Sequence, residues 1–317
     1  MSEQNDIHPL VPPDIEREIF ELTIRECPGT GPRLCLVARR VNTWIQPLLY
    51  TVIIYRGISR YPNFGKHKAE RVRHLLLGGT SQDYQITWFI KNCSNLRSLA
   101  LWPSVHRTVP AGEVKKALLK HAESRSAAAL DSTRVGLTHL SIGWEKWFNT
   151  NDQTFKSPIF KNLTHLDLLD SSLADWDDWK GLVFLPSLTH LAINRNYTIP
   201  FLTHLLEERE KLVVVVILAD TAWCTEHGRY LEERRRERYQ RRSTKRRSAS
   251  SDATTAGQEE EEATQEGYVK GQIVDGRLVF LKTGQAETEW HNAAHGFVSF
   301  WDRAEDMAYA QMAKSSR

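Results

Sequence analysis

The side chains best suited to chemistry are three histidines that recur in one short pattern. Three copies of the tetrapeptide Leu-Thr-His-Leu recur at a nearly fixed period, and they place His139, His165 and His190 at steps of 26 and 25 residues. If the three segments form neighbouring parallel strands, the imidazoles stand about 4.8 Å apart and could together bind zinc. No Cys, Asp or Glu completes a closed ligand set, so we expect a repeated polar position and no metal site.

Other arrangements of reactive residues point away from catalysis. Asp175-Trp-Asp-Asp-Trp179 offers carboxylates but lacks the glycine and the distal glutamate of a calcium-binding loop. The sequence contains no nucleophile elbow, phosphate-binding loop or dinucleotide fingerprint. We therefore expect a non-catalytic interaction protein that uses no cofactor.

The histidines belong to a longer repeat that must position them. The pattern L-x-x-L-x-L, with looser copies, recurs at steps of 23, 24, 41, 26, 25 and 24 residues, which is the period of a leucine-rich repeat. Each unit supplies a short strand and a crossover, and it buries its leucines only by stacking on its neighbours. We therefore predict an α/β fold, an irregular leucine-rich-repeat solenoid with a curved parallel sheet and outer helices over residues 49–228. The copies begin at Leu49, Val72, Leu96, Leu137, Leu163, Leu188 and Leu212.

The strand register predicts which side chains face outward on the concave side of the sheet. Leu212–Leu218 is apolar at inward and outward positions alike, so this strand should be covered on both faces, with Phe300 and Trp301 in the covering helix. The middle strands carry polar outward residues, either as a solvated sheet face or as the binding site of a target protein. The predicted target-binding residues are Trp102, His139, Ser141, Trp144, His165, Asp167, His190, Asn194 and Arg195.

Residues 10–48 differ from the repeats and predict two short helices. Pro12-Pro13-Asp14 is typical of a helix start, and an apolar stripe follows it. Cys27–Pro32 breaks this helix, and a second helix should carry Leu34, Val37, Val41 and Trp44 on one stripe before it ends near Pro47. Two such helices are too small to form a domain, so they must pack on the repeats or on another protein.

This N-terminal segment resembles an F-box in its divergent, F-box-like form. The resemblance rests on Val11-Pro-Pro-Asp-Ile15, Leu34-Cys-Leu-Val-Ala-Arg-Arg40 and Trp44, and the continuation into the first strand is similar to leucine-rich-repeat F-box-like proteins of mushroom-forming fungi. The resemblance implies a substrate-recognition subunit of a cullin-type (SCF) ubiquitin ligase that binds a Skp-type adaptor. The adaptor-binding residues that it implies are Pro12, Pro13, Asp14, Ile15, Ile19, Phe20, Leu34, Leu36, Val37 and Trp44.

The composition of residues 229–268 allows alternative hypotheses for the function. The run 229–247 holds ten Arg or Lys against three Glu, and it could be a solvated helix, a nuclear-import tract or a phosphate-binding patch. Residues 248–266 contain no apolar side chain larger than alanine and should be disordered. The alternatives are thus a stand-alone leucine-rich-repeat scaffold, or a nuclear protein that uses 229–247 on nucleic acid. We expect no nucleic-acid partner, because the run offers few aromatic rings for base stacking.

Composition and the two ends of the chain predict the cellular compartment, the oligomeric state and the terminal structure. The chain has 317 residues, a formal net charge of +3 and four cysteines without C-x-x-C spacing, which is typical of reduced thiols in the cytoplasm or nucleus. No apolar run approaches the roughly 20 residues that span a bilayer. We expect a monomer with a disordered start at 1–9 and a terminal strand and capping helix within 269–317.

Overall fold

The computed structural model describes ten stretches of the chain together with two single positions. They are residues 11–57, 64–79, 81, 83–103, 114, 116–118, 136–143, 155–169, 176–194, 198–218, 275–281 and 286–315. The predicted disordered start at 1–9 and the charged segment 229–268 lie outside them.

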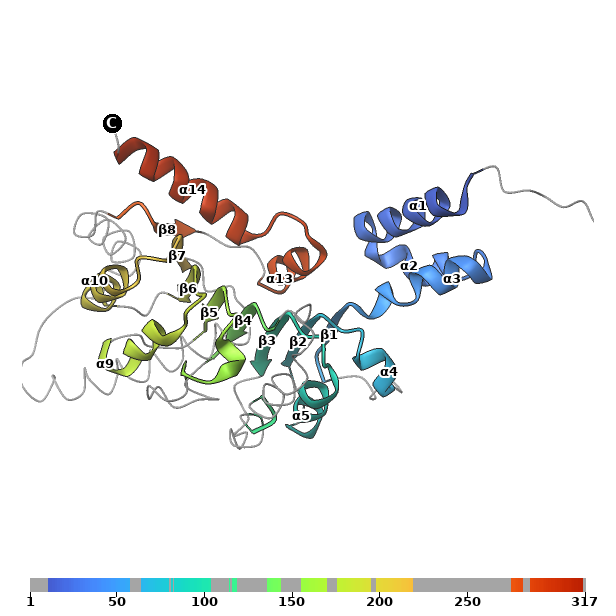
Figure 1. Cartoon of the computed structure of the whole chain (residues 1–317), viewed down its shortest axis with the longest axis horizontal. Coiled ribbons are helices and arrows are strands. Elements are labelled where there is room, and N and C mark those ends of the chain that lie inside the picture. The colour runs from blue at the N-terminus through green and yellow to red at the C-terminus, as the bar shows by residue number, and fades with distance from the viewer. Residues whose placement is uncertain are drawn as a thin grey trace, which may run out of the picture.

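One open parallel β-sheet of eight strands organises the structure (Figure 1), and the predicted α/β class is confirmed. Every strand pairs with the next one in the chain, so β1 and β8 form the two edges. The register aligns the outward residues of β2 to β7 in one row, as predicted: His74, Ser98, His139, His165, His190 and Val214. The strands are β1 (Val52–Tyr55), β2 (His74–Gly79), β3 (Ser98–Pro103), β4 (His139–Ile142), β5 (His165–Leu168), β6 (His190–Asn194), β7 (Val214–Leu218) and β8 (Leu278–Leu281).

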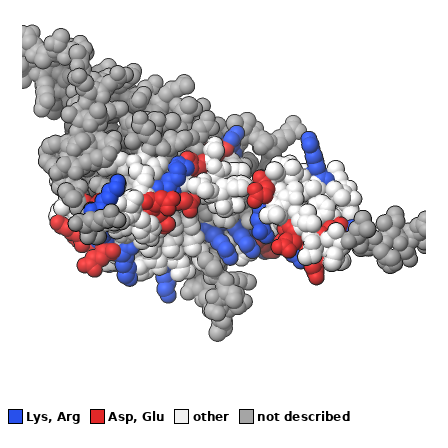
Figure 2. All heavy atoms as spheres, turned by 90° about the horizontal axis from the view of Figure 1, so that it is seen from above, with Lys and Arg blue, Asp and Glu red and all other residues white. Residues whose placement is uncertain are grey.

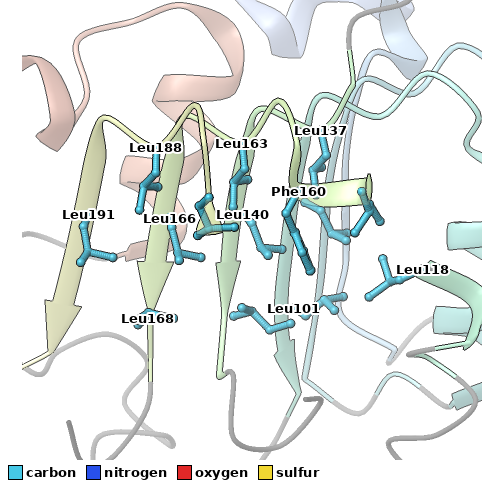
Figure 3. Close-up of a cluster of buried hydrophobic side chains, with 14 of the residues drawn as sticks. Leu101, Leu118, Leu137, Leu140, Phe160, Leu163, Leu166, Leu168, Leu188 and Leu191 are labelled. Atoms are coloured by element: carbon cyan, nitrogen blue, oxygen red, sulfur yellow. The ribbon is translucent and has the colours of Figure 1, made fainter. Parts of the chain in front are cut away.

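The inward side chains of these strands form the main core. Because side chains alternate across a strand, the residue after each of these histidines is a leucine that points to the opposite face. Figure 3 shows Leu140, Leu166 and Leu191 side by side on neighbouring strands, with Leu163 and Leu188 at equivalent positions before their strands. We call the two sides of the sheet the leucine face and the histidine face.

Helices in the crossovers cover the leucine face. Helix α5 (Asp83–Asn92) contributes Phe89, and α10 (Ile199–Glu208) contributes Phe201 to the same core. The Thr198 side chain caps α10 by accepting a hydrogen bond from the Phe201 N–H at 3.3 Å. Short helices α4 (Lys66–Ala69) and α9 (Trp176–Trp179) and the 3₁₀ segments η3 (Pro158–Phe160) and η4 (Lys180–Phe184) complete this layer.

A buried arginine ties successive crossovers together. Arg209 lies after α10, and its guanidinium donates hydrogen bonds to the carbonyls of Val183, Leu185 and Leu188 at 3.0, 2.6 and 3.2 Å. These carbonyls have no strand partner, and the planar fork of one arginine satisfies all three.

The N-terminal segment contains three short helices where the sequence predicts two. Helix α1 (Pro13–Glu26) begins as predicted and is followed by η1 (Pro28–Thr30), α2 (Gly31–Leu34), α3 (Arg39–Ile45) and η2 (Leu48–Tyr50). The prediction of one continuous second helix is wrong, because α2 tightens into 3₁₀-type bonds and Ala38 is extended, with φ −158° and ψ 155°. The extended residue redirects α3, so that Val41 and Ile45 turn into a small core with Ile24.

Two helices follow β8 and cover the histidine face. A helix is present where the sequence predicts the capping helix, α14 (Phe300–Ser315), whereas α13 (Ala286–His295) was not predicted. Ser299 donates its N–H and hydroxyl to the Asp302 carboxylate, both at 2.7 Å, and so fixes the start of α14. Figure 1 shows both helices on the side of the sheet opposite α5 and α9. We call them the C-terminal helix pair.

The last strands are buried on both faces, as the apolar run Leu212–Leu218 predicts. All five residues of β7 are buried, and the outward Val214, Val216 and Leu218 share a second core with Phe300, Ala304 and Ala308 of α14. Within the described part of the chain, no helix is long and apolar enough to cross a membrane.

Candidate functional site

The three repeated histidines form a stack on the histidine face. The ring of His165 lies between those of His139 and His190, with centroids 4.1 and 4.0 Å apart and planes inclined by only 12° and 9°. In each repeat, the threonine before the histidine places its hydroxyl 2.8–2.9 Å from the imidazole Nδ1. The Thr-His pair therefore fixes the ring orientation and leaves Nε2 directed away from its own strand.

The C-terminal helix pair meets this stack directly. Trp301 of α14 lies edge-on to His165 and His190, with ring centroids 5.2 and 5.7 Å apart, and the His190 Nε2 lies 2.5 Å from the Glu305 carboxylate. Burial, together with a smaller contribution from neighbouring histidines, lowers the pKa of His139 to about 4 and that of His165 to about 2. The stack is therefore neutral near pH 7. Among the described residues, no group of three or more His, Cys, Asp or Glu is arranged to hold a metal ion.

A second polar cluster connects three strands of the same face. The Trp102 indole N–H donates to the Ser141 hydroxyl at 2.8 Å, and this hydroxyl donates to the Asp167 carboxylate at 2.6 Å. Asp167 is buried, and its second carboxylate oxygen finds no hydrogen-bond partner among the described residues. Burial raises the pKa of Asp167 to about 7, although the hydrogen bond from Ser141 opposes this rise.

We expect Ser141→Ala to destabilise the chain by about 1–3 kcal/mol, because it removes the hydrogen bond to a buried carboxylate. Urea denaturation followed by circular dichroism measures this free energy of unfolding. Ser98→Ala is the matched control: Ser98 is a buried serine of β3 on the same face, and its hydroxyl donates none of these bonds. Equal losses from the two substitutions would contradict the assigned role of Ser141.

The predicted open binding face is covered in this structure. Ser141, Asp167 and His190 are only 5–7 % exposed, because α13 and α14 extend beyond β7 and over the middle strands. Two ion pairs hold the helix pair: Arg303 bonds to Glu289 between the two helices, and Arg56 after β1 bonds to Glu287 of α13. The expectation that these polar side chains face solvent is therefore wrong, and the sequence predicted cover only over the far end of the sheet.

The remaining predicted target-binding residues fall into two groups. Trp102, His139 and His165 are partly buried, and they line a small cavity of about 40 Å³ beneath α13 and α14. Trp144, Arg195 and the side chain of Asn194 lie outside the described residues. Trp290 of α13, which is not among the predicted residues, lines the same cavity. Its spacing from Ala286 and Ala293, four and three residues, is the signal that predicts an apolar helix face here.

The helices α1 to α3 carry a separate apolar surface. Ile15 and Ile19 are 48 and 53 % exposed, and Leu36 and Val37, in the turn after α2, are 85 and 62 % exposed. Pro12, Pro13 and Asp14 are also exposed, at the start of α1. Phe20, Leu34 and Trp44, predicted to bind the adaptor, instead pack against the small core of this segment.

An ion pair holds the two main helices of this segment in register. The Arg40 guanidinium donates two hydrogen bonds to the Glu16 carboxylate, at 2.7 and 2.9 Å, and so joins α3 to α1. The bonds from Arg40 lower the pKa of Glu16, and the bonds to Glu16 raise the pKa of Arg40. The exposed apolar side chains therefore lie on helices whose relative orientation is fixed by an ion pair.

Comparison of the chain with protein-family models, with curated proteins and with solved structures finds no significant match.

Proposed function

We propose that this chain is a substrate-recognition subunit of a cullin-type (SCF) ubiquitin ligase. In this proposal α1 to α3 act as an F-box-like segment that binds a Skp-type adaptor, and the remainder of the chain holds a target protein. The proposal combines the sequence resemblance of residues 10–48 with the distribution of exposed apolar side chains.

One observation carries the adaptor-binding part of the proposal. Eleven large apolar side chains are exposed in the described part of the chain, and six of them lie between residues 11 and 37. An exposed cluster of this kind marks an interaction surface, because single scattered apolar residues are the normal condition of a protein surface. The six are Val11, Ile15, Ile19, Leu22, Leu36 and Val37.

The geometry of α1 suits docking to a groove. Ile15, Ile19 and Leu22 follow one another at four and three residues, so they share one stripe of the helix. Burying one such side chain contributes about 1.5–3 kcal/mol, and an apolar stripe of this type is what a helix inserts into a partner's groove. The small core behind the stripe, with Val41 and Ile45 fully buried, keeps the surface rigid.

The repeats support the second part of the proposal. The parallel strands follow one another in chain order, and the L-x-x-L-x-L copies each contribute one strand and one layer of leucines. We infer an irregular leucine-rich-repeat solenoid, a class that offers extended surfaces to protein partners. The target would bind outside the area that the C-terminal helix pair covers.

Capture of a Skp-type adaptor by the purified chain tests the proposal. We expect Ile19→Asp to abolish capture, since a charge in an apolar interface costs several kcal/mol. Ile19 is exposed in the free chain, so circular dichroism should show the variant folded. Val298→Asp is the matched control, because Val298 is 67 % exposed next to α14 and far along the chain from α1.

The opposite results have distinct meanings. If the wild-type chain captures no adaptor, the chain is a stand-alone scaffold whose N-terminal helices only cap the repeats. If Ile19→Asp and Val298→Asp capture the adaptor equally well, the adaptor binds elsewhere and the apolar surface of α1 has another partner.

A further inference from the structure

A cleft of about 930 Å³ lies where the N-terminal helices meet the first strands and α13. Its walls come from the end of α1, the segment 47–52, the entries to β2 and β3, and the last turns of α13. The volume lies in the range of small-ligand and peptide pockets. Neither the stripe of α1 nor the histidine stack uses this cleft.

The lining of the cleft is strongly basic. In the part of the chain that the structure describes, it contains four arginines against a single acidic residue, Glu70. Figure 2 shows that basic and acidic side chains are mixed over the upper face of the molecule, so an excess of one sign in one cleft stands out. The arginines are Arg25, Arg71, Arg73 and Arg97.

The sheet places two of these arginines side by side. Arg73 and Arg97 directly precede β2 and β3, and the Arg97 N–H donates to the Arg73 carbonyl at 2.7 Å. Their side chains therefore start about one strand spacing apart, roughly 4.8 Å. Within the described part of the chain, Arg71, Arg73 and Arg97 form no ion pair, whereas Arg25 lies 3.8 Å from Glu21. Three guanidinium groups thus remain available for an anion.

The positive charge in the cleft contributes to lowered pKa values of neighbouring histidines. The pKa of His74, the first residue of β2, falls to about 4, chiefly through burial and further through His139, His295, Arg97 and Arg73. His295 and His291 line the cleft with ring centroids 4.4 Å apart, and burial together with His291 lowers the pKa of His295. An anion in the cleft would relieve this mutual repulsion.

We propose that this cleft binds an acidic peptide segment of the target protein, with its Asp and Glu carboxylates on Arg71, Arg73 and Arg97. The guanidinium fork matches the carboxylate geometry and gives strong charge-assisted hydrogen bonds. Ile24, Leu48 and Leu49 also line the cleft and suit an aliphatic side chain of the same peptide. The assignment rests on the proposed function in one respect only, that the peptide belongs to a ligase target.

The lining favours a peptide over nucleic acid. Among the described residues, it contains no Phe, Tyr or Trp on which a base could stack, and binding of single strands depends on such rings. Its apolar portion is built from aliphatic side chains and from Pro28 and Pro47. This combination suits alternating carboxylate and aliphatic side chains.

Fluorescence anisotropy with the full purified chain, and no adaptor, tests the proposal. The probe is a short labelled peptide in which Asp and Glu alternate with Leu, and its Asn/Gln counterpart is the uncharged control. We expect the double substitution Arg73→Glu with Arg97→Glu to weaken binding at least about 100-fold, since each lost charged hydrogen bond alone is worth a factor of ten or more. The milder pair Arg73→Gln with Arg97→Gln keeps the test valid if charge reversal disturbs folding.

A matched control separates the cleft from the overall charge. Lys91→Glu with Lys161→Glu changes the net charge equally, on exposed residues at the end of α5 and after η3, and should alter affinity less than about threefold. Equal weakening by the two pairs would overturn the cleft assignment. Equal competition by single-stranded RNA of matched charge would overturn the peptide assignment, and binding only of a phosphorylated peptide would overturn the carboxylate assignment.

The two proposals fail in different ways. A wild-type chain that ignores the acidic peptide but captures the adaptor would overturn the cleft assignment alone. A chain that binds the peptide through Arg73 and Arg97 but captures no adaptor would overturn the ligase function and leave an acidic-peptide binder. The charge-reversed chain should capture the adaptor as the wild type does, because α1 keeps its exposed stripe.

Discussion

Ala304→Asp should destabilise the chain by about 4 kcal/mol or more. Ala304 is fully buried between α14 and the last strands, in one apolar cluster with Val214, Val216 and Phe300. The substitution places a carboxylate where no described residue offers it a partner, and a buried unpaired charge is among the most costly single changes. Urea denaturation of the full chain, followed by circular dichroism and tryptophan fluorescence, measures the loss.

Met307→Asp provides the control on the same helix. Met307 lies three residues further along α14 and is 41 % exposed, so the added carboxylate remains hydrated and the expected change stays within about 0.5 kcal/mol. Comparable losses from both substitutions would mean that α14 tolerates a charge on its inner face and does not pack on β7 as described. A large loss from Ala304→Asp alone would establish that the helix pair is part of the folded core.

The repeat and its register could be predicted because period and alternation both follow from strand geometry. Once Leu163-Thr-His-Leu-Asp-Leu168 is read as a strand, side chains must alternate, and each copy with a histidine places its leucines on one face and that histidine on the other. The same logic predicted the two-sided burial of β7 and its cover by Phe300. These features depend on neighbours within one pattern, so a single sequence suffices.

The cover over the middle strands could not be predicted from the same pattern. Polar outward residues such as Ser141 and Asp167 suggest a solvated face, but here they are satisfied in part by one another and by residues of β3. His190 meets Glu305, a residue 115 positions later. Contacts between residues so far apart in the chain produce no periodic pattern in the sequence. The apolar stripe of α13 is also too weak to predict that this helix covers the sheet.

The basic cleft could not be predicted from the sequence for a similar reason. Arg25, Arg73, Arg97 and His295 are separated widely in the chain and are brought together only where α1, the starts of β2 and β3, and α13 meet. The break between α2 and α3 also depends on tertiary contacts, since no glycine or proline occupies residues 34–38. The extended Ala38 is favoured because it lets Val41 and Ile45 reach the core around Ile24.

Acidification from pH 6.5 to pH 4.5 should lower the free energy of unfolding by several kcal/mol. The folded chain holds the pKa of His74 and His139 at about 4 and that of His165 at about 2, whereas an unfolded histidine has a pKa of about 6.5. Below pH 6.5 the unfolded chain therefore takes up protons that the folded chain refuses, and stability is lost as the pH falls toward the folded pKa values. Each such histidine contributes about 1.4 kcal/mol per pH unit.

Two further groups on the same face change the pH dependence of stability. Asp167 acts in the opposite direction, and His190 acts in the same direction but less strongly. The pKa of Asp167 is raised to about 7, so its burial costs less as the pH falls from 7 toward the unfolded value near 4. Burial lowers the pKa of His190, and Glu305 and Asp302 partly counter this by favouring its charged form. Three histidines against one aspartate leave a net loss of roughly 2–3 kcal/mol per pH unit within the window.

Urea midpoints at several pH values between 7 and 4.5 measure this slope, and two variants test its origin. His165→Gln removes the central ring of the stack, so the slope should fall by about one proton, or roughly 1.4 kcal/mol per pH unit. His67→Gln, on exposed α4, should leave the slope unchanged, because that side chain lies outside the stack. A wild-type profile that is flat from pH 6.5 to 4.5 would mean that the histidine face admits protons, and with them water, and that the C-terminal helix pair does not keep it closed.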